Sequence, residues 1–237
     1  MIEIDVDPHD VASARLWAAV DDLSDLLPSD WVLIGGLMVQ LHAMEHGVEN
    51  VRVTTDVDVL AQARPQRPLR AIDKTLRGEG FEVEEPDRDG YSFRYVREGF
   101  VVDLLASDGV KPPPALTGGR RAISVPGGSQ ALERQEAVTV RLSDRAFTLR
   151  RPTLLGAILI KARSLLVHED PASQREDLVL LLSLVDDPRA MAGDLLRSER
   201  QWLRRAQEPL AFDRPANVSA DRQRRARLTL RLLVGSD

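Results

Sequence analysis

Cysteine is absent from the 237-residue sequence, and apolar runs of membrane length are missing as well. The lack of cysteine excludes disulfide bonds, thiolate metal sites and a thiol nucleophile. The longest apolar segments fall short of the ~20 residues that a bilayer-spanning helix needs. The first ten residues are acidic and lack the basic start of a secretory signal peptide. These absences predict a cytoplasmic protein without a membrane partner.

Lysine is nearly missing too, since three lysines stand against 29 arginines. The two are not interchangeable, because lysine carries a compact ammonium and arginine a planar fork of donors. Lys161 interrupts the apolar stretch 154–167, and this position allows two interpretations. It is either a long side chain at a helix edge that reaches solvent, or an ammonium placed for a ligand.

The formal net charge of −5 is unevenly distributed along the chain. Residues 1–60 contain twelve acids and two arginines, whereas residues 197–231 contain ten arginines and four acids. The C-terminal stretch can therefore attract a phosphate backbone that the N-terminal stretch repels. Within it, Arg224, Arg227 and Arg231 recur at helical spacing and predict one basic stripe, which is either solubilising or an RNA-docking surface.

The chain is organised around residues 31–60, where two predicted strands flank a glycine pair and a helix. The apolar run 31–34 predicts a short strand that stops at Gly35 and Gly36. A helical pattern follows, and residues 51–60 then alternate with period two, which predicts the second strand. Glycine lets the backbone approach a ligand closely, and the start of a helix offers free N–H groups to a phosphate.

Two acids stand in the second of these strands. Asp56 and Asp58 are two residues apart, so their side chains point to the same face, roughly 7 Å apart at Cα. Paired carboxylates suit a core badly and suit divalent cations well. A lone Asp-x-Asp also occurs in acidic loops, and a lone Gly-Gly occurs in turns. The combination predicts a site for a metal and a nucleoside triphosphate.

The order of strand, Gly-Gly, helix and Arg-x-Thr-Thr-Asp-x-Asp strand resembles the nucleotidyltransferase superfamily that includes DNA polymerase β. It is more closely similar to the AbiEii-type nucleotidyltransferases, the toxins of type IV toxin–antitoxin pairs. The resemblance implies nucleotide binding by the first four of the residues that carry it and metal binding by the last two. These residues are Gly35, Gly36, Arg52, Thr55, Asp56 and Asp58.

Asp103 lies inside the apolar run 100–105, which predicts a strand. A buried carboxylate is costly without a partner or a metal, so one of the two is expected here. The resemblance implies that Asp103 is the third metal ligand beside Asp56 and Asp58, and that it takes the proton from, or orients, the attacking hydroxyl.

The resemblance also assigns two residues of the second half of the chain. It implies that Lys161, on the first helix after the catalytic domain, faces the phosphates of the nucleotide. It further implies that an acid one helix later supports this lysine, and the run Arg175-Glu176-Asp177-Leu178 places that acid at Asp177.

The implied activity is transfer of a nucleoside monophosphate from an NTP to an acceptor, with release of pyrophosphate. Mg²⁺, or Mn²⁺, would be the cofactor, RNA such as a tRNA 3′ end the acceptor, and a cognate antitoxin protein a partner. Two other classes stay open: a small-molecule nucleotidyltransferase of the antibiotic-modifying kind, and a non-catalytic nucleotide-binding protein. Leu37 keeps the last one open, because many superfamily members carry Ser or Thr there to hold the triphosphate.

We expect an α/β fold in which residues 1–151 form a nucleotidyltransferase domain with a mixed sheet and residues 152–237 form an α-helical domain. The active site is expected in the cleft between them. Residues 107–129 are punctuated by Pro and Gly and predict a long surface loop that carries Arg120 and Arg121, which is either a loop for the acceptor or a family-variable insertion. The helices expected in the second half cover residues 154–167, 171–185, 191–206 and 219–234.

Overall fold

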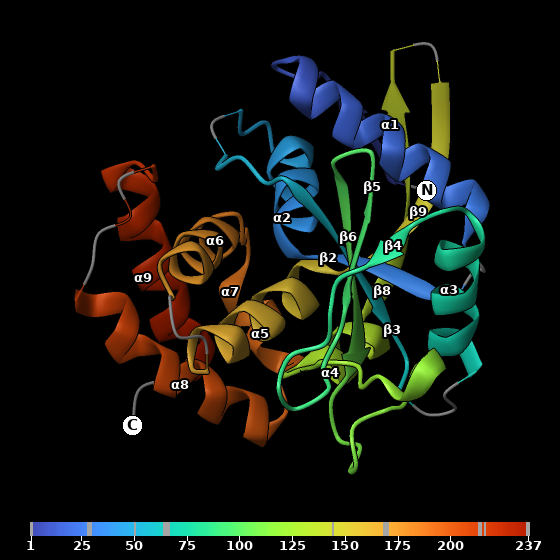
Figure 1. Cartoon of the computed structure of the whole chain (residues 1–237). Helices are drawn as coiled ribbons and strands as arrows, with labels where there is room; N and C mark the ends of the chain where they lie inside the picture. Colours follow the sequence, from blue (N-terminus) through green and yellow to red (C-terminus); the bar gives the residue numbers. More distant parts are fainter. Residues whose placement is uncertain are drawn as a thin grey trace.

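The computed structural model describes residues 2–27, 30–49, 51–63, 67–143, 145–167, 171–212, 215 and 217–235. Its strands all come from the first two thirds of the chain, and the last third is helical, as Figure 1 shows. The strands are β1 (Ile2–Val6), β2 (Trp31–Ile34), β3 (Asp56–Ala61), β4 (Glu82–Val83), β5 (Arg94–Arg97), β6 (Phe100–Ser107), β7 (Ser124–Val125), β8 (Gln135–Leu142) and β9 (Arg145–Pro152).

The helices divide between the two parts of the chain. Those of the first part are α1 (Val11–Leu26), α2 (Gly35–Glu45), α3 (Arg67–Gly78) and α4 (Gly128–Glu133), with a short 3₁₀ turn at Thr117–Gly119. Those of the last part are α5 (Leu154–Leu165), α6 (Ala172–Ser183), α7 (Pro188–Gly193), α8 (Arg197–Phe212) and α9 (Ala220–Val234).

The main sheet has the order β2-β3-β6-β5-β4, with the short β7 pairing with the end of β6. Strands β3 and β6 run parallel, whereas β2–β3, β6–β5 and β5–β4 are antiparallel. The predicted mixed sheet is therefore confirmed. Strands β3 and β6 lie inside the sheet and, apart from their acids, are apolar on both faces, as strands covered on two sides are.

A second sheet has the order β1-β8-β9, in which β1 joins β8 in parallel and the β8–β9 hairpin is antiparallel. Helix α1 lies alongside β9 (Figure 1). The side chain of Asp10 begins this helix by accepting a hydrogen bond from the Ser13 N–H at 2.7 Å. Such a cap satisfies one of the four N–H groups that a helix start leaves unpaired.

One hydrophobic cluster runs through both parts of the chain. It joins Ile34 at the end of β2 and Leu105 of β6 to Ile158 of α5, Leu181 of α6 and Leu233 of α9. Because α5 and α6 pack on the sheet through this cluster, the site described below lies between elements that share one core. The predicted boundary at 151 and 152 coincides with the end of β9, and independent folding of the two parts stays a prediction.

The predicted strand 51–60 is wrong in its first half, since β3 begins at Asp56. Strand β2 ends at Ile34, whose register partner is Asp58, so the residues before Asp56 have no strand beside them on that side. The segment 51–55 instead forms no regular secondary structure, and its Arg52 and Thr54 side chains bind Asp177 and Asp56.

Residues 107–129 are mostly irregular and near the surface, as predicted, but several of them are anchored in the core. Leu116 and Ala122 are buried, and the stretch contributes β7 and the first residues of α4. Arg120 is not open to an acceptor, because its guanidinium pairs with the fully buried Asp73. The many prolines and glycines of this stretch mark turns between buried anchor points.

The helical part differs from the prediction around residue 191. Asp187 caps a short helix, α7, by accepting from the N–H groups of Arg189 and Ala190, and Pro188 occupies its first turn. The sequence contains this start signal, because proline is favoured in the first turn of a helix. Helix α8 then covers Arg197–Phe212 rather than 191–206.

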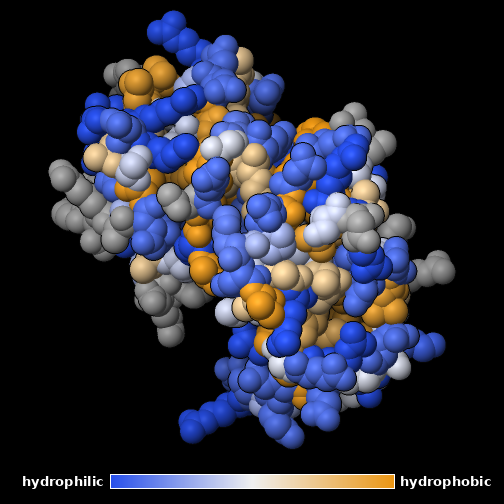
Figure 2. All heavy atoms as spheres, turned by 90° about the horizontal axis from the view of Figure 1, so that it is seen from above, coloured by the Kyte–Doolittle hydropathy of each residue, from blue (hydrophilic) through white to orange (hydrophobic). Residues whose placement is uncertain are grey.

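The surface seen from above is mostly hydrophilic, with small hydrophobic patches between charged side chains (Figure 2). None of the described helices combines the length and apolar content that crossing a membrane demands.

Candidate active site

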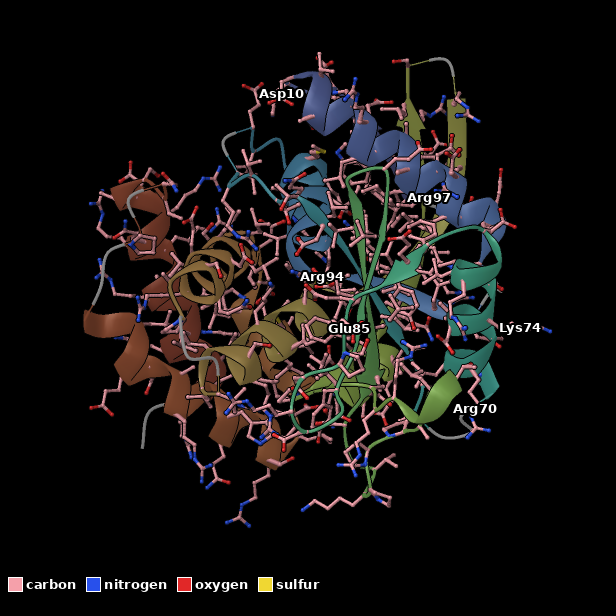
Figure 3. All side chains as sticks on the ribbon, in the orientation of Figure 1. Asp10, Arg70, Lys74, Glu85, Arg94 and Arg97 are labelled. Carbon is pink, nitrogen blue, oxygen red and sulfur yellow. The ribbon has the colours of Figure 1, made fainter. Side chains whose placement is uncertain are left out.

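A pocket of about 590 Å³ lies where the main sheet meets α5 and α6. Its walls come from the β2–α2 junction, from β3, β5 and β6, from residues 123–126, and from α5 and the start of α6. Arg94, which lines it, lies in the middle of the molecule, whereas Arg70 and Lys74 extend outward from α3 (Figure 3). The expected cleft between the strand-bearing and helical parts is present.

Three carboxylates line one side of this pocket. Asp56 and Asp58 follow the predicted period-two spacing on β3, and both face the pocket. Asp103 of β6 is the register partner of Asp58 in the parallel pair. Residues paired in this way have side chains on the same face of a sheet. The pairing of β3 with β6 thus brings together the three acids that the sequence analysis assigned to metal.

Burial raises the pKa of Asp58 to about 7, and the nearby Asp56 carboxylate adds to this shift. The ammonium of Lys161 opposes it. Burial also raises the pKa of Asp103, against the opposing effect of Arg94. Ionisation of Asp58 in this pocket is therefore costly.

Arg94 neutralises Asp103, which satisfies the expectation that this buried acid has a partner. Its Nε and Nη2 donate to the two carboxylate oxygens of Asp103 at 2.9 and 2.8 Å. The same Nη2 lies 3.7 Å from Oδ2 of Asp56. Sequence analysis did not identify Arg94, because no local pattern marks it and only the β5–β6 pairing places it opposite Asp103.

The glycine pair brings the start of α2 against the acids. A Cβ on Gly35, whose φ is +70°, would lie 1.7 Å from Oδ2 of Asp58. A Cβ on Gly36 would lie 2.7 Å from the Cβ of Thr54. Only residues without a side chain fit here, since real Cβ atoms do not approach so closely. Both glycines still line the pocket, so the helix start is open to a ligand.

Lys161 and Arg52 converge on one buried acid. Asp177 accepts from Nε and Nη2 of Arg52 at 2.8 and 2.9 Å, and Nζ of Lys161 lies 2.7 Å from its Oδ2. Burial alone would raise the pKa of Asp177, but the charges of Lys161 and Arg52 outweigh it and the net pKa is lowered. Lys161 is 4% exposed, so its ammonium does not reach bulk solvent. It lines the pocket beside Gln174, whose Oε1 accepts from it at 3.1 Å.

Thr55 is not brought together with the other assigned residues. It is exposed and lines a second pocket of about 390 Å³, on the other side of the segment 51–55. The neighbouring Thr54 is buried and donates its hydroxyl to Asp56 at 2.8 Å. Period-two counting from Asp56 points to Thr54, and that signal was available in the sequence.

A different trio has the spacing of ligands for one metal ion. Single ligand atoms of His42, Glu45 and Glu136 lie within 4.8 Å of one another, the one such group among the described residues. The buried guanidinium of Arg151 already pairs with both glutamates. We therefore interpret the trio as part of an ion-pair network with Arg151 that joins α2 to β8 and β9. His46 does not complete it, since its Nδ1 lies 2.8 Å from the His42 carbonyl oxygen.

Leu37, the departure from the resembling superfamily, is 1% exposed and belongs to the core. It does not line the pocket, where hydroxyl groups come instead from Ser124, Ser164 and Ser173. A protein of this sequence would thus bind a triphosphate without a hydroxyl at the third position of α2.

The sequence matches no protein-family model, and no curated protein matches it.

The close approach of Gly35 to Asp58 gives a matched test. Gly35→Ala and Gly47→Ala both place a side chain at positive φ, which costs about 1–2 kcal/mol. At Gly47 no atom lies within 4 Å of the new Cβ, whereas at Gly35 it collides with Asp58. We expect Gly35→Ala to lose more free energy of unfolding in urea than Gly47→Ala. Equal losses would show that the Asp58 carboxylate moves aside freely.

The raised pKa of Asp58 predicts an unusual pH dependence of stability. The folded chain keeps the Asp58 proton up to about pH 7, whereas the ordinary pKa is 3.8, so the wild type loses stability as the pH rises between these values. In EDTA, Asp58→Asn should therefore be more stable than the wild type at pH 8, by ~1–3 kcal/mol. This gain should vanish toward pH 4. Thermal melts across this pH range provide the measurement. An increase in the stability of the wild type relative to Asp58→Asn as the pH rises would contradict the raised pKa.

Proposed function

We propose that the chain is a metal-dependent nucleotidyltransferase of the AbiEii type, with the corresponding fold in its first part. It would move a nucleoside monophosphate from an NTP to an acceptor and release pyrophosphate. The observation that carries the proposal is the arrangement of Asp58 and Asp103 as register partners, with Asp56 on the same face. A helix start and a buried ammonium complete the same pocket.

The donor set suits the proposed metal. Asp56, Asp58 and Asp103 offer only oxygen atoms, which Mg²⁺ and Mn²⁺ prefer. When bound, such ions would polarise the transferred phosphoryl group and assist ionisation of the attacking hydroxyl. Asp56 and Asp58 would hold them, and Asp103 would orient the attacking hydroxyl or accept its proton. The hydrogen bonds that Arg94 donates to Asp103 compete with this role.

The balance of charge supports a metal and a triphosphate binding together. The charged groups of the pocket and its wall are four carboxylates (Asp56, Asp58, Asp103 and Asp177) and three cations (Arg52, Arg94 and Lys161). With Asp58 either protonated or ionised, a bare triphosphate would meet at least as many carboxylates as cations. Bare metal ions would meet three positive charges. A metal–nucleotide complex adds little net charge and avoids both penalties.

The polar groups divide the work of holding the nucleotide. The start of α2 at Gly35 and Gly36 offers N–H groups and the positive end of a helix to phosphate oxygens. Lys161 faces the same space, and Asp177 keeps its ammonium at the pocket wall. Charges fixed in this way before the reaction stabilise a developing charge without reorganisation.

The apolar part of the lining suits a nucleobase. Phe93, Leu105, Ile123 and Ile160 line the pocket next to the acids. The volume of about 590 Å³ is that of a small-molecule site. Such a pocket admits one nucleotide and only the end of a larger acceptor, which agrees with the 3′ end of an RNA such as tRNA.

We extend the proposal to the biological role that the resemblance implies, a cytoplasmic toxin restrained by a cognate antitoxin protein. The basic residues of α9 support an RNA acceptor. Arg227 and Arg231 are exposed, and neither side chain has a hydrogen bond or ion pair to any described residue. Arg224 and Arg225 differ, because they pair with Asp221 and Asp186.

The transfer reaction is tested directly by incubating the protein with each labelled NTP, Mg²⁺ and total RNA. Label should enter RNA, and Asp58→Asn and Asp103→Asn should each lower the rate at least ~100-fold. The matched control is Glu82→Gln, which removes an exposed carboxylate from β4 of the same sheet and should react as the wild type does.

Added acceptors and binding measurements separate the alternatives. Label that enters added aminoglycosides, but no RNA, would identify a small-molecule transferase. Binding of NTP that requires Mg²⁺, without any transfer, would identify a non-catalytic nucleotide-binding protein. Equal binding of NTP in Mg²⁺ and in EDTA would refute the metal site itself.

The α9 arginines predict the salt dependence of RNA binding. Each phosphate contact contributes ~0.7–0.9 to the slope of log affinity against log salt. The double variant Arg227→Gln, Arg231→Gln should bind RNA more weakly and flatten this slope by up to ~1.8, while NTP binding stays unchanged. Arg224→Gln, Arg225→Gln removes the same charge from paired positions and should flatten the slope less. If both double variants kept the salt slope of the wild type, α9 would not belong to the RNA-binding surface.

A further inference from the structure

Three neighbouring strands place Asp58, Asp103 and Arg94 in one row across the sheet. Asp103 of β6 pairs in register with Asp58 of β3 on one side and with Arg94 of β5 on the other. The guanidinium of Arg94 binds both oxygens of Asp103 and lies 3.7 Å from Asp56. A fixed cation thus faces the same carboxylates that the proposed function assigns to metal.

This contact restricts what Asp103 can do. Both of its oxygens accept hydrogen bonds from Arg94, and its side chain is 6% exposed. Among the described residues, Asp56, Asp58 and Asp103 do not form a group whose ligand atoms all lie within 4.8 Å of one another. The protein in this arrangement therefore holds Asp103 away from a shared cation site.

Arg94 differs in its surroundings from the other arginines near the pocket. Arg52 is bound to Asp177, and Arg120 to Asp73 and Tyr95, none of which is an assigned metal ligand. The carboxylate partners of Arg94 are themselves assigned ligands. Its side chain is 36% exposed and lines the pocket, so it can turn into the pocket without burying its own charge unpaired, once a cation takes its place beside Asp103.

We propose that Arg94 is an exchangeable counter-ion of the acid site. In the free protein it holds Asp103 and competes with divalent cations. When a cation and a nucleotide enter together, it releases Asp103 and binds a phosphate of the nucleotide. The second half rests on the proposed function, whereas the competition with a cation does not.

The chemistry of the guanidinium suits both partners. Its planar fork binds a carboxylate through two parallel hydrogen bonds and can bind a phosphate in the same way. An ammonium at this position would keep the charge and lose the fork. When Arg94 exchanges Asp103 for a phosphate, Arg94 stays paired with an anion and Asp103 pairs with the cation. An arginine that stayed on Asp103 would instead face the incoming cation.

Binding of Mn²⁺ without nucleotide tests the competition. Titrations followed by electron paramagnetic resonance would compare the wild type with Arg94→Gln, Arg94→Lys and Arg97→Gln. Removal of a unit charge a few ångströms from the cation should tighten Mn²⁺ binding by Arg94→Gln roughly 10-fold. Arg94→Lys keeps the charge and should stay within about 2-fold of the wild type. Arg97 is on the same strand but lies over Phe81, and its variant should bind Mn²⁺ as the wild type does.

Binding of NTP in saturating Mg²⁺, measured by calorimetry, tests the exchange. Arg94→Gln and Arg94→Lys should both bind NTP roughly 10-fold more weakly, because both lack the fork that grips a phosphate. The opposite directions of the two effects in Arg94→Gln, tighter Mn²⁺ and weaker NTP, are not produced by a merely structural role.

Each result decides one part of the proposal. A folded Arg94→Gln that binds Mn²⁺ no tighter than the wild type overturns the competition. An Arg94→Lys protein with wild-type NTP affinity overturns the transfer to phosphate, and this variant decides that half even where Arg94→Gln does not fold. Tighter Mn²⁺ binding in a protein whose wild type binds no NTP supports the competition and overturns the proposed function instead.

Discussion

The pairing register of β3 with β6 is the constraint on which the rest of the pocket depends. It sets Asp58 directly beside Asp103, with Asp56 on the same face. This placement is unfavourable for charged carboxylates, since burial first, and then the neighbouring acids, raise the pKa of Asp58. The surrounding elements supply what this placement requires: a helix start without side chains, a buried ammonium and two arginines.

The cations around the acids fall into two groups. Arg52 and Lys161 are held by Asp177, which is 1% exposed and joins the segment before β3 to helices α5 and α6. This group is fixed whether or not a ligand is present, because its acid is not an assigned ligand. Arg94 forms the second group and depends on the acids themselves. A site built in this way has one permanent positive wall and one exchangeable counter-ion.

The helical part contributes to the pocket through packing as well as through charge. Ile158 and Leu181 belong to the cluster that also contains Ile34 and Leu105. Rigid packing of this kind keeps Lys161 at a fixed distance from the acids across a boundary that the sequence suggested was a division between domains. A core shared by both parts is needed to hold these charges in place, because exposed ion pairs between loosely joined parts contribute little to stability.

The sequence by itself determined which residues share a face and where chemistry gathers. The run 31–34, the glycine pair, the period-two acids and the acid within an apolar strand are local patterns, and each fixes a side-chain direction through strand or helix periodicity. Local periodicity also pointed to Thr54. Tertiary structure alone decided that Asp58 stands beside Asp103, that Arg94 neutralises it, and that the stretch 107–129 is anchored by Asp73. Register between distant strands and the choice of counter-ion depend on contacts across the whole chain, and no local pattern carries them.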